Sequence, residues 1–320
     1  MNTSVSPERP AGWPEAMASG VRRAGLWPLR VAWLLAALLI GGPFLRAIDR
    51  SSAPAVLVLE VALWALWFGG AVASMVPSPA SLTVVRTLAL SSIGWSIIGV
   101  LVSDEPQLWV ALGFAVVLTV VAFQLEVGNQ MVNGSAYGSE RRMTLRPPAF
   151  ALAGPVQVAW GLVFAGLTVG PLLLTSGRWI LGVLAVAAGG GAIWLGARVL
   201  HQLARRWIVF VPAGFVIHDP VVLGESILLG RTKLAALGPV GAPLHPEAID
   251  LGRGARGLAL GVRGLEPVDF TVRTAQGFDQ TSGSLLVFNP SRPGAVLSEA
   301  RIRAIPIGAP EPAPVSPNDI

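Results

Sequence analysis

The sequence predicts an α-helical polytopic membrane bundle of six spans, followed by a small β-rich cytoplasmic domain. Of 320 residues, 53% are hydrophobic and 13% are charged, with a mean hydropathy of +0.64. Soluble domains carry about 25% charged residues. Runs of about 20 apolar residues, the length that crosses a hydrocarbon core, recur in the first two thirds of the chain. After Trp207 the pattern changes to short apolar runs separated by Gly and Pro, which is typical of β-rich domains.

Residues 1–27 contain no apolar stretch like that of a signal peptide, so we expect a cytoplasmic N-terminal tail. The transmembrane domain is expected over 28–204, with spans at 29–48, 54–76, 81–102, 107–126, 148–175 and 178–200. The first span is the weakest, because Gly41-Gly42-Pro43 should interrupt its helix near the end. Whether this first span crosses the membrane completely stays open.

Arginine placement indicates the orientation, because cytoplasmic segments are enriched in positive charge. One side of the six spans carries nine arginines and the other side carries three. The richer side is formed by Arg22, Arg23, Arg30, Arg141, Arg142, Arg146, Arg198, Arg205 and Arg206. This asymmetry predicts a multi-pass protein of the cell membrane with both termini in the cytoplasm.

The loop 127–147 is a polar island between two long apolar runs, and it holds the chain's only tyrosine. Its inner-face group comprises Tyr137, Glu140, Arg141, Arg142 and Arg146. Arginines beside the membrane attract anionic lipid headgroups and also set topology. Two readings stay open: the loop only fixes the orientation, or it makes a specific contact with the chain's own β domain or with a partner.

Residues 205–304 are expected to form the β-rich soluble domain. "RRWIVFVPAGFVIHD" contains two strand-like runs joined by a Pro-Ala-Gly turn, and "RPGAVLSEARIRA" is typical of a short amphipathic helix. From residue 305 the Pro-rich "IPIGAPEPAPVSPNDI" predicts a disordered tail over 305–320.

The order of hairpin, further strands and closing helix resembles the pleckstrin-homology-like domains of bacterial membrane proteins. The resemblance covers the last third of the chain, through "VFVPAGFVIHD", "RTKLAALGPV" and "SRPGAVLSEARIR". It implies a PH-like fold. Lipid-binding members of that fold carry a basic first hairpin loop, whereas this loop is the uncharged Pro212-Ala213-Gly214. The alternative is another small β-sandwich or barrel.

Charged residues inside the expected spans deserve a functional hypothesis, because burying charge in lipid is costly. Glu60 and Arg86 could form a transport site, but their expected depths differ by about 12 Å along the membrane normal. We therefore expect orienting pairs near the two faces instead, Arg46 with Glu60 and Glu126 with Arg86.

The last span carries small residues at alternating spacings of three and four, which favours close helix packing. This helix-packing stripe comprises Gly182, Ala185, Gly189, Ala192 and Gly196. An alanine-rich helix without a chosen face is the alternative.

Catalysis finds little support in the sequence. The chain has no cysteine, and its three histidines lack metal-ligand spacing. His218-Asp219 is interpreted as the end of a strand, and "GRGARG" (252–257) as a turn. External loops are too short for the carboxylates of a lipid-linked glycosyltransferase.

The sequence therefore favours a non-catalytic assembly, scaffold or regulatory component of a bacterial membrane, without a cofactor. Its expected partners are the lipid bilayer with its anionic headgroups, and a protein partner or a second copy of the chain, but no nucleic acid. One alternative is a transporter or channel subunit that uses Glu60 and Arg86. A lipid-processing membrane enzyme ranks third.

Overall fold

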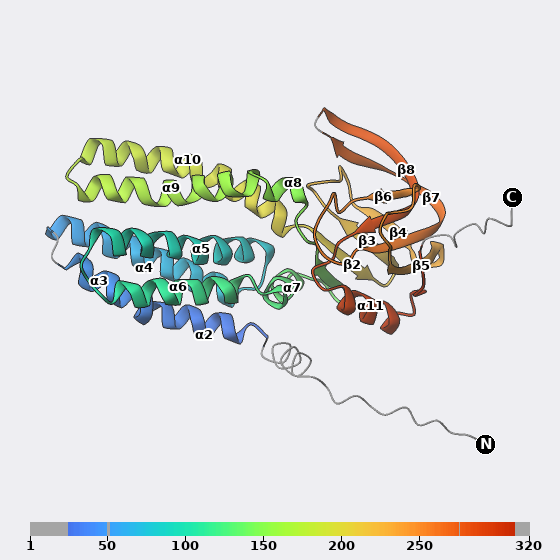
Figure 1. Ribbon diagram of the computed structural model, residues 1–320, viewed down its shortest axis with the longest axis horizontal. Helices are drawn as coiled ribbons and strands as arrows, with labels where there is room; N and C mark the ends of the chain where they lie inside the picture. Colours follow the sequence, from blue (N-terminus) through green and yellow to red (C-terminus); the bar gives the residue numbers. More distant parts are fainter. Residues whose placement is uncertain (1–24, 50–51, 275, 311–320) are drawn as a thin grey trace, which may run out of the picture.

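A computed structural model describes residues 25–49, 52–274 and 276–310. A bundle of roughly parallel helices occupies one end of the molecule and two β-sheets occupy the other (Figure 1). The bundle comprises α2 (Trp27–Ala36), the π-helical turn η1 (Ala37–Gly41), α3 (Gly42–Ile48), α4 (Ala53–Met75), α5 (Pro79–Val102), α6 (Leu108–Ala122), α7 (Leu125–Asn133), α8 (Ala149–Leu152), α9 (Pro155–Thr175) and α10 (Trp179–Ala204). Most of the expected N-terminal tail lies outside the described residues.

Five helical segments are long and apolar enough to cross a membrane, and the pair α6–α7 would provide a sixth span. This confirms the coarse prediction of a multi-span helical domain. The first segment, Trp27–Ile48, is continuous, so the expected interruption at Gly41-Gly42-Pro43 does not occur. Instead, η1 widens the helix just before Pro43, and the Gly42 N–H donates to the Ala37 carbonyl. A π-turn of this kind accommodates the hydrogen bond that a proline cannot make.

The fourth and fifth spans differ from their expected form. The fourth is broken, because α6 ends at Ala122 and α7 leaves it at an angle of 56°. The fifth begins with the short α8, and the chain breaks at Ala153-Gly154 before α9. Both α7 and α8 lie at the end of the bundle that meets the sheets (Figure 1).

Reciprocal hydrogen bonds between α2 and α4, and close packing of α9 against α10, hold the helices together. In the core, Trp33 of α2 donates its indole N–H to the Trp67 carbonyl of α4 at 2.9 Å, and Trp67 returns a bond of 3.0 Å to Trp33. These two indole N–H groups are therefore satisfied by protein carbonyls, as a hydrocarbon environment requires. Separately, α9 and α10 form a close hairpin alongside α4 and α5 (Figure 1).

Two four-stranded sheets make up the β domain. The first has the order β1-β2-β3-β4 and is entirely antiparallel: β1 (Arg141–Thr144), β2 (Trp207–Val211), β3 (Gly214–His218) and β4 (Ile227–Gly230). The second has the order β5-β7-β8-β6: β5 (Leu234–Pro239), β6 (Ala248–Asp250), β7 (Leu260–Thr274) and β8 (Gly277–Phe288). A 3₁₀ turn, η2 (Arg231–Lys233), joins the two sheets, and α11 (Pro293–Ile302) follows the last strand.

The hairpin β2–β3 and the closing helix α11 stand where the sequence predicts them. The first strand does not, because β1 comes from the loop between the fourth and fifth spans, more than 60 residues before β2. The loop 127–147 is therefore not a simple connection within the transmembrane domain. Met143 and Leu145 of this segment are buried in the core of the β domain.

The expected disorder from residue 305 onward is wrong for 305–310. Ile305 is buried, and Leu237 of β5 both donates to the Pro306 carbonyl at 2.9 Å and accepts from the Gly308 N–H at 3.2 Å. These residues thus extend along β5 beside the second sheet. The rest of the expected tail, 311–320, lies outside the described residues.

Candidate functional site: the junction between the helices and the sheets

The helix α7 presents a polar face to β1, and this contact forms the centre of the junction. Its apolar side packs into the bundle through Val127, Met131 and Val132. Asn129 lies on the polar side, where its Oδ1 accepts from the Thr144 N–H at 2.8 Å and from the Thr144 hydroxyl at 2.9 Å. The backbone of β1 is therefore bonded by side chains of α7 on one edge and by β2 on the other.

Further contacts extend the junction to the start of α11. Asn133 accepts from the Arg142 N–H at 3.0 Å, and Glu126 forms an ion pair with Arg292. Ser291 donates its N–H to the Thr144 carbonyl at 2.8 Å. We define the junction as Glu126, Asn129 and Asn133 of α7, the segment 142–146, Arg206, Asp219, and 289–292.

A fully buried ion pair lies beside this contact. The guanidinium of Arg206 donates to both carboxylate oxygens of Asp219, at 2.8 and 2.5 Å, and the two side chains are 1% and 0% exposed. Its third nitrogen donates to the Arg146 carbonyl. Asp219 also accepts from the Val221 and Val222 N–H groups at 3.1 and 3.2 Å. Every charged atom of the pair therefore has a partner, which is the condition for keeping such a pair in a dry interior.

His218 lies at the edge of the junction. Its ring stacks on Trp207 at 4.8 Å, and Nδ1 lies 2.7 Å from the Ser226 hydroxyl. Burial lowers the pKa of His218 below 6.5, and the nearby Arg205 lowers it further, whereas Asp219 acts in the opposite direction. His218-Asp219 does end a strand, as the sequence predicts.

The five residues of the inner-face group have different surroundings. Tyr137 is 86% exposed, and Arg141 is exposed on β1. Arg142 forms an ion pair of 3.1 Å with Glu140, donates to the Ser135 hydroxyl at 3.0 Å and lies 5.4 Å above the Trp207 ring. Arg146 packs against Gly257, and its N–H donates to the Asn289 carbonyl at 2.8 Å. The loop therefore contacts the chain's own β domain, one of the two readings left open by the sequence.

The charged residues of the spans do not pair as expected. Arg86 donates to the Ala122 carbonyl at 3.2 Å and lies 5.1 Å from the centre of the Phe123 ring, so it caps the broken end of α6. A carbonyl left free at a helix end attracts such a cation. Glu126 instead pairs with Arg292, and Arg46 donates to Gln107. Glu60 is half-buried and makes no ion pair within the described ranges.

The helix-packing stripe faces α9 of the same chain. Gly182, Gly189 and Gly196 are buried, whereas Ala185 and Ala192 are half-buried. A Cβ added at Gly189 would lie 2.7 Å from the Gly166 carbonyl oxygen. The glycines therefore allow the backbones of the α9–α10 hairpin to touch.

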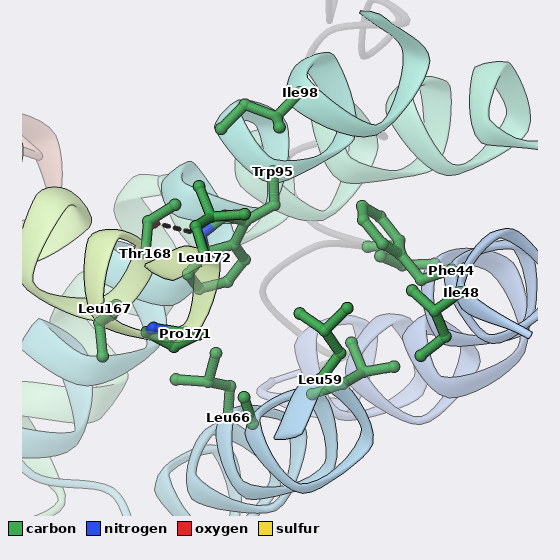
Figure 2. Close-up of a pocket in the computed structure, with 13 residues that line it drawn as sticks. Phe44, Ile48, Leu59, Leu66, Trp95, Ile98, Leu167, Thr168, Pro171 and Leu172 are labelled. Atoms are coloured by element: carbon green, nitrogen blue, oxygen red, sulfur yellow. Dashed lines mark hydrogen bonds between the residues drawn. The ribbon is translucent and has the colours of Figure 1, made fainter. Parts of the chain in front are cut away.

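Between α3, α4, α5 and α9 lies an apolar cavity of about 140 Å³. Figure 2 shows Phe44, Leu59 and Trp95 around it, together with the hydrogen bond of 2.9 Å from the Trp95 indole to the Thr168 hydroxyl. A second apolar cavity of about 60 Å³ shares four lining residues with it: Ile40, Leu63, Leu66 and Trp95. Neither Glu60 nor Arg86 lines either cavity.

The sequence did not predict the two central contacts of the junction, between Asn129 and Thr144 and between Arg206 and Asp219. One local signal was present: in "RRMTL" the apolar residues Met143 and Leu145 alternate with polar ones, which is a strand pattern. No known protein family, curated protein or solved structure matches the chain.

Proposed function

We propose that this chain is a non-catalytic assembly or regulatory component of a bacterial cell membrane that holds its β domain in a fixed position at the membrane surface. The observation that carries the proposal is the origin of β1. A strand taken from the loop between two spans makes the β domain continuous with the bundle, rather than a module on a flexible tether.

Three connections support a fixed position. The Asn129–Thr144 contact joins α7 to β1, the Glu126–Arg292 ion pair joins α7 to the start of α11, and the Arg206–Asp219 pair joins the end of α10 to β3. Buried polar contacts of this kind favour one geometry, because any other leaves a charge or an amide unpaired. A component that positions partners needs such a defined geometry.

The proposed orientation places the β domain and both termini in the cytoplasm. It rests on the excess of arginine on that side of the spans. The proposal also includes a PH-like relationship for the β domain, supported by two antiparallel-rich sheets and a closing helix. The strand β1, which comes from the loop between two spans, is not part of the order of hairpin, strands and closing helix on which this relationship rests.

A transporter or channel subunit that uses Glu60 and Arg86 is the alternative. The surroundings of Arg86 favour a structural role, because its guanidinium caps α6. The two cavities between the helices are lined almost entirely by apolar side chains, which suit hydrocarbon better than an ion. We therefore rank this function second, and a lipid-processing enzyme third.

Photo-crosslinking tests the proposal. A benzoylphenylalanine at Leu228, which is 54% exposed on the edge strand β4, should capture one discrete protein in cells. The same residue at Trp194, which is 60% exposed on α10, serves as the membrane control and should not capture it.

The triple variant Glu126→Ala/Asn129→Ala/Asn133→Ala removes the side-chain contacts of α7 with β1 and α11 while leaving β1 in its sheet. It should lose the crosslinked protein although the β domain still resists protease. Crosslinking that survives this detachment would contradict a role for the fixed position. If Glu60→Gln instead abolished a solute flux in proteoliposomes at an unchanged melting temperature, the transporter function would replace this one.

A further inference from the structure

The loop 252–257, "GRGARG", is a built structure with a defined shape; we call it the arginine loop. The carboxylate of Asp250 accepts from the Arg253 and Gly254 N–H groups at 3.0 and 3.2 Å. On the other side, the Asn289 amide donates to the carbonyls of Ala255 and Gly257 at 3.2 Å each. Arg253 adopts a positive φ of 46°, a conformation that non-glycine residues rarely take without such support. The direction of its side chain is therefore fixed by the fold.

The arginine loop lies beside the short helix that precedes the candidate membrane span α9. Its Arg253 carbonyl accepts from the N–H of Ala149, the first residue of α8, at 3.3 Å. The apolar span α9 begins only six residues later, at Pro155. Phe150 and Leu152 of α8 are 45% and 46% exposed, as expected for a turn in contact with lipid. The backbone of this loop is therefore held close to the start of the candidate span α9.

The same loop is joined to the end of the long hairpin β7–β8. Arg253 donates from its side chain to the Arg273 carbonyl at 2.5 Å. Arg273 faces Phe278 across the hairpin, and its guanidinium lies 5.0 Å from the centre of the Phe278 ring. In Figure 1 the tip of this hairpin projects sideways from the sheets and turns back toward the level of α8.

The chemistry of this surface suits an anionic interface. Arg253, Arg256 and Arg273 form no ion pair within the part of the chain that the structure describes, whereas Arg206, Arg263 and Arg303 each do. Phe278 is 57% exposed beside them. Asp279, the nearest carboxylate along the strand, pairs with Val272 and so points to the opposite face of the hairpin. Exposed cations together with an aromatic ring are the residues that bind membrane surfaces.

We propose that Arg253, Arg256, Arg273 and Phe278 form a membrane-contact site that binds the phosphate groups of anionic lipids, with the Phe278 ring inserted among the lipids. This site is separate from the first hairpin loop, Pro212-Ala213-Gly214, which carries no charge. The lipids are those of the leaflet on the β-domain side, whichever compartment it faces. The site acts as a second attachment of the β domain, on the side away from α7.

The cysteine-free chain allows a direct test. A nitroxide on Gln276→Cys reports the hairpin tip with Phe278 intact, and one on Ile302→Cys, which replaces a residue 77% exposed on α11, is the matched control. The protein is placed in nanodiscs of phosphatidylcholine alone or of phosphatidylcholine with phosphatidylglycerol. With phosphatidylglycerol, the label at 276 should collide several-fold more with oxygen than with a water-soluble nickel chelate. The label at 302 should show the reverse ratio in both compositions.

Two triple variants identify the charge. Arg253→Gln/Arg256→Gln/Arg273→Gln should return the label at 276 to a water-like ratio, whereas the corresponding Lys variant should keep it in the membrane, at matching melting temperatures. Phe278→Ser should reduce the depth of the label but preserve the anionic lipid seen by native mass spectrometry. A water-like label at 276 in both compositions would overturn the proposal. Equal insertion with and without phosphatidylglycerol, or in the Gln variant, would overturn the role of the headgroups.

Discussion

At the scale of single residues, the Arg206–Asp219 pair shows that the role of a charged residue depends on its burial. The sequence counts Arg206 among the residues that orient the protein, yet its guanidinium is buried and fully hydrogen-bonded. An exposed arginine would serve topology equally well. The burial of this one indicates that it also specifies how the helices join the sheets.

Removing one partner of this pair should destabilise the β domain strongly. We expect Asp219→Leu or Arg206→Met to cost about 3–5 kcal/mol, because each leaves an uncompensated buried charge. The double variant should cost less than the sum of the two, since no charge then remains buried. Denaturant unfolding in detergent measures the cycle. Lys233→Met, at the exposed Lys233–Glu266 pair, is the control and should cost at most about 1 kcal/mol. Additive losses in the cycle would contradict a direct coupling.

The lowered pKa of His218 predicts a pH dependence of stability. Between the folded pKa and the unfolded value of 6.5, the unfolded chain binds more protons, so stability falls as the pH falls. The contribution is fully present above pH 6.5 and is lost as the solution is acidified toward the folded pKa. His218→Phe keeps the stack on Trp207 and should flatten this part of the profile.

His245→Phe is the control, and thermal melts from pH 5 to 8 give the comparison. The control should retain the slope of the wild type. An unchanged slope in His218→Phe would assign the pH dependence to another group.

At this scale, the sequence predicted individual roles better than partners. The apolar runs, the hairpin turn at Pro212-Ala213 and the end of β3 at His218 follow from local patterns, and the structure has them. The partners of Glu126 and Arg86 do not follow from depth alone. The break after Ala122 turns Glu126 toward Arg292 and leaves the Ala122 carbonyl free to accept from Arg86. The spacing of the charged residues in the sequence predicts neither contact.

At the scale of elements, the α9–α10 hairpin depends on glycines at one face only. A Cβ at Gly189 meets the backbone of α9, whereas nothing lies within 4 Å of a Cβ at the adjacent Gly190. We therefore expect Gly189→Ala to lower stability by about 1–3 kcal/mol through overpacking. Gly190→Ala should leave it unchanged or raise it slightly, because alanine favours helix.

Melting temperatures of the two variants in one detergent provide the measurement. Equal effects would mean that the stripe is not a packing face. The spacing of the small residues predicted this stripe but could not name its partner, because a periodic face on one helix does not specify which helix packs against it. The partner α9 contributes Gly166 and Gly170, which are four residues apart.

At the scale of the whole molecule, the β-rich domain and the multi-span bundle followed from the sequence patterns, but the division into two sheets and the connection to the bundle did not. The strand β1 has only four residues and lies in a polar loop between two long apolar runs. Its alternating pattern is therefore too short to predict a strand. Pairing between residues more than 60 positions apart is a tertiary choice that no local propensity encodes.

The orientation can be tested with single cysteines. Ser176 lies between α9 and α10, and Ser282 is exposed on β8. In intact cells, an impermeant maleimide should label Ser176→Cys and should not label Ser282→Cys until the cells are opened. Labelling of Ser282→Cys in intact cells would invert the proposed topology. The same variants give equal labelling in detergent if both sites are accessible.

The pairing of β1 with β2 has a consequence for biosynthesis. The ribosome releases β1 first, then α9 and α10, and only afterwards β2. The two strands can meet only if the intervening helices cross the bilayer twice and return the chain to the face that it left. If one of these helices failed to insert, β1 and β2 would lie on opposite sides of the membrane. Ile208 and Phe210 could then not pack with Met143 in the core of the β domain. Pairing of β1 with β2 therefore requires that both α9 and α10 insert, so the complete first sheet forms only in chains with the correct membrane topology.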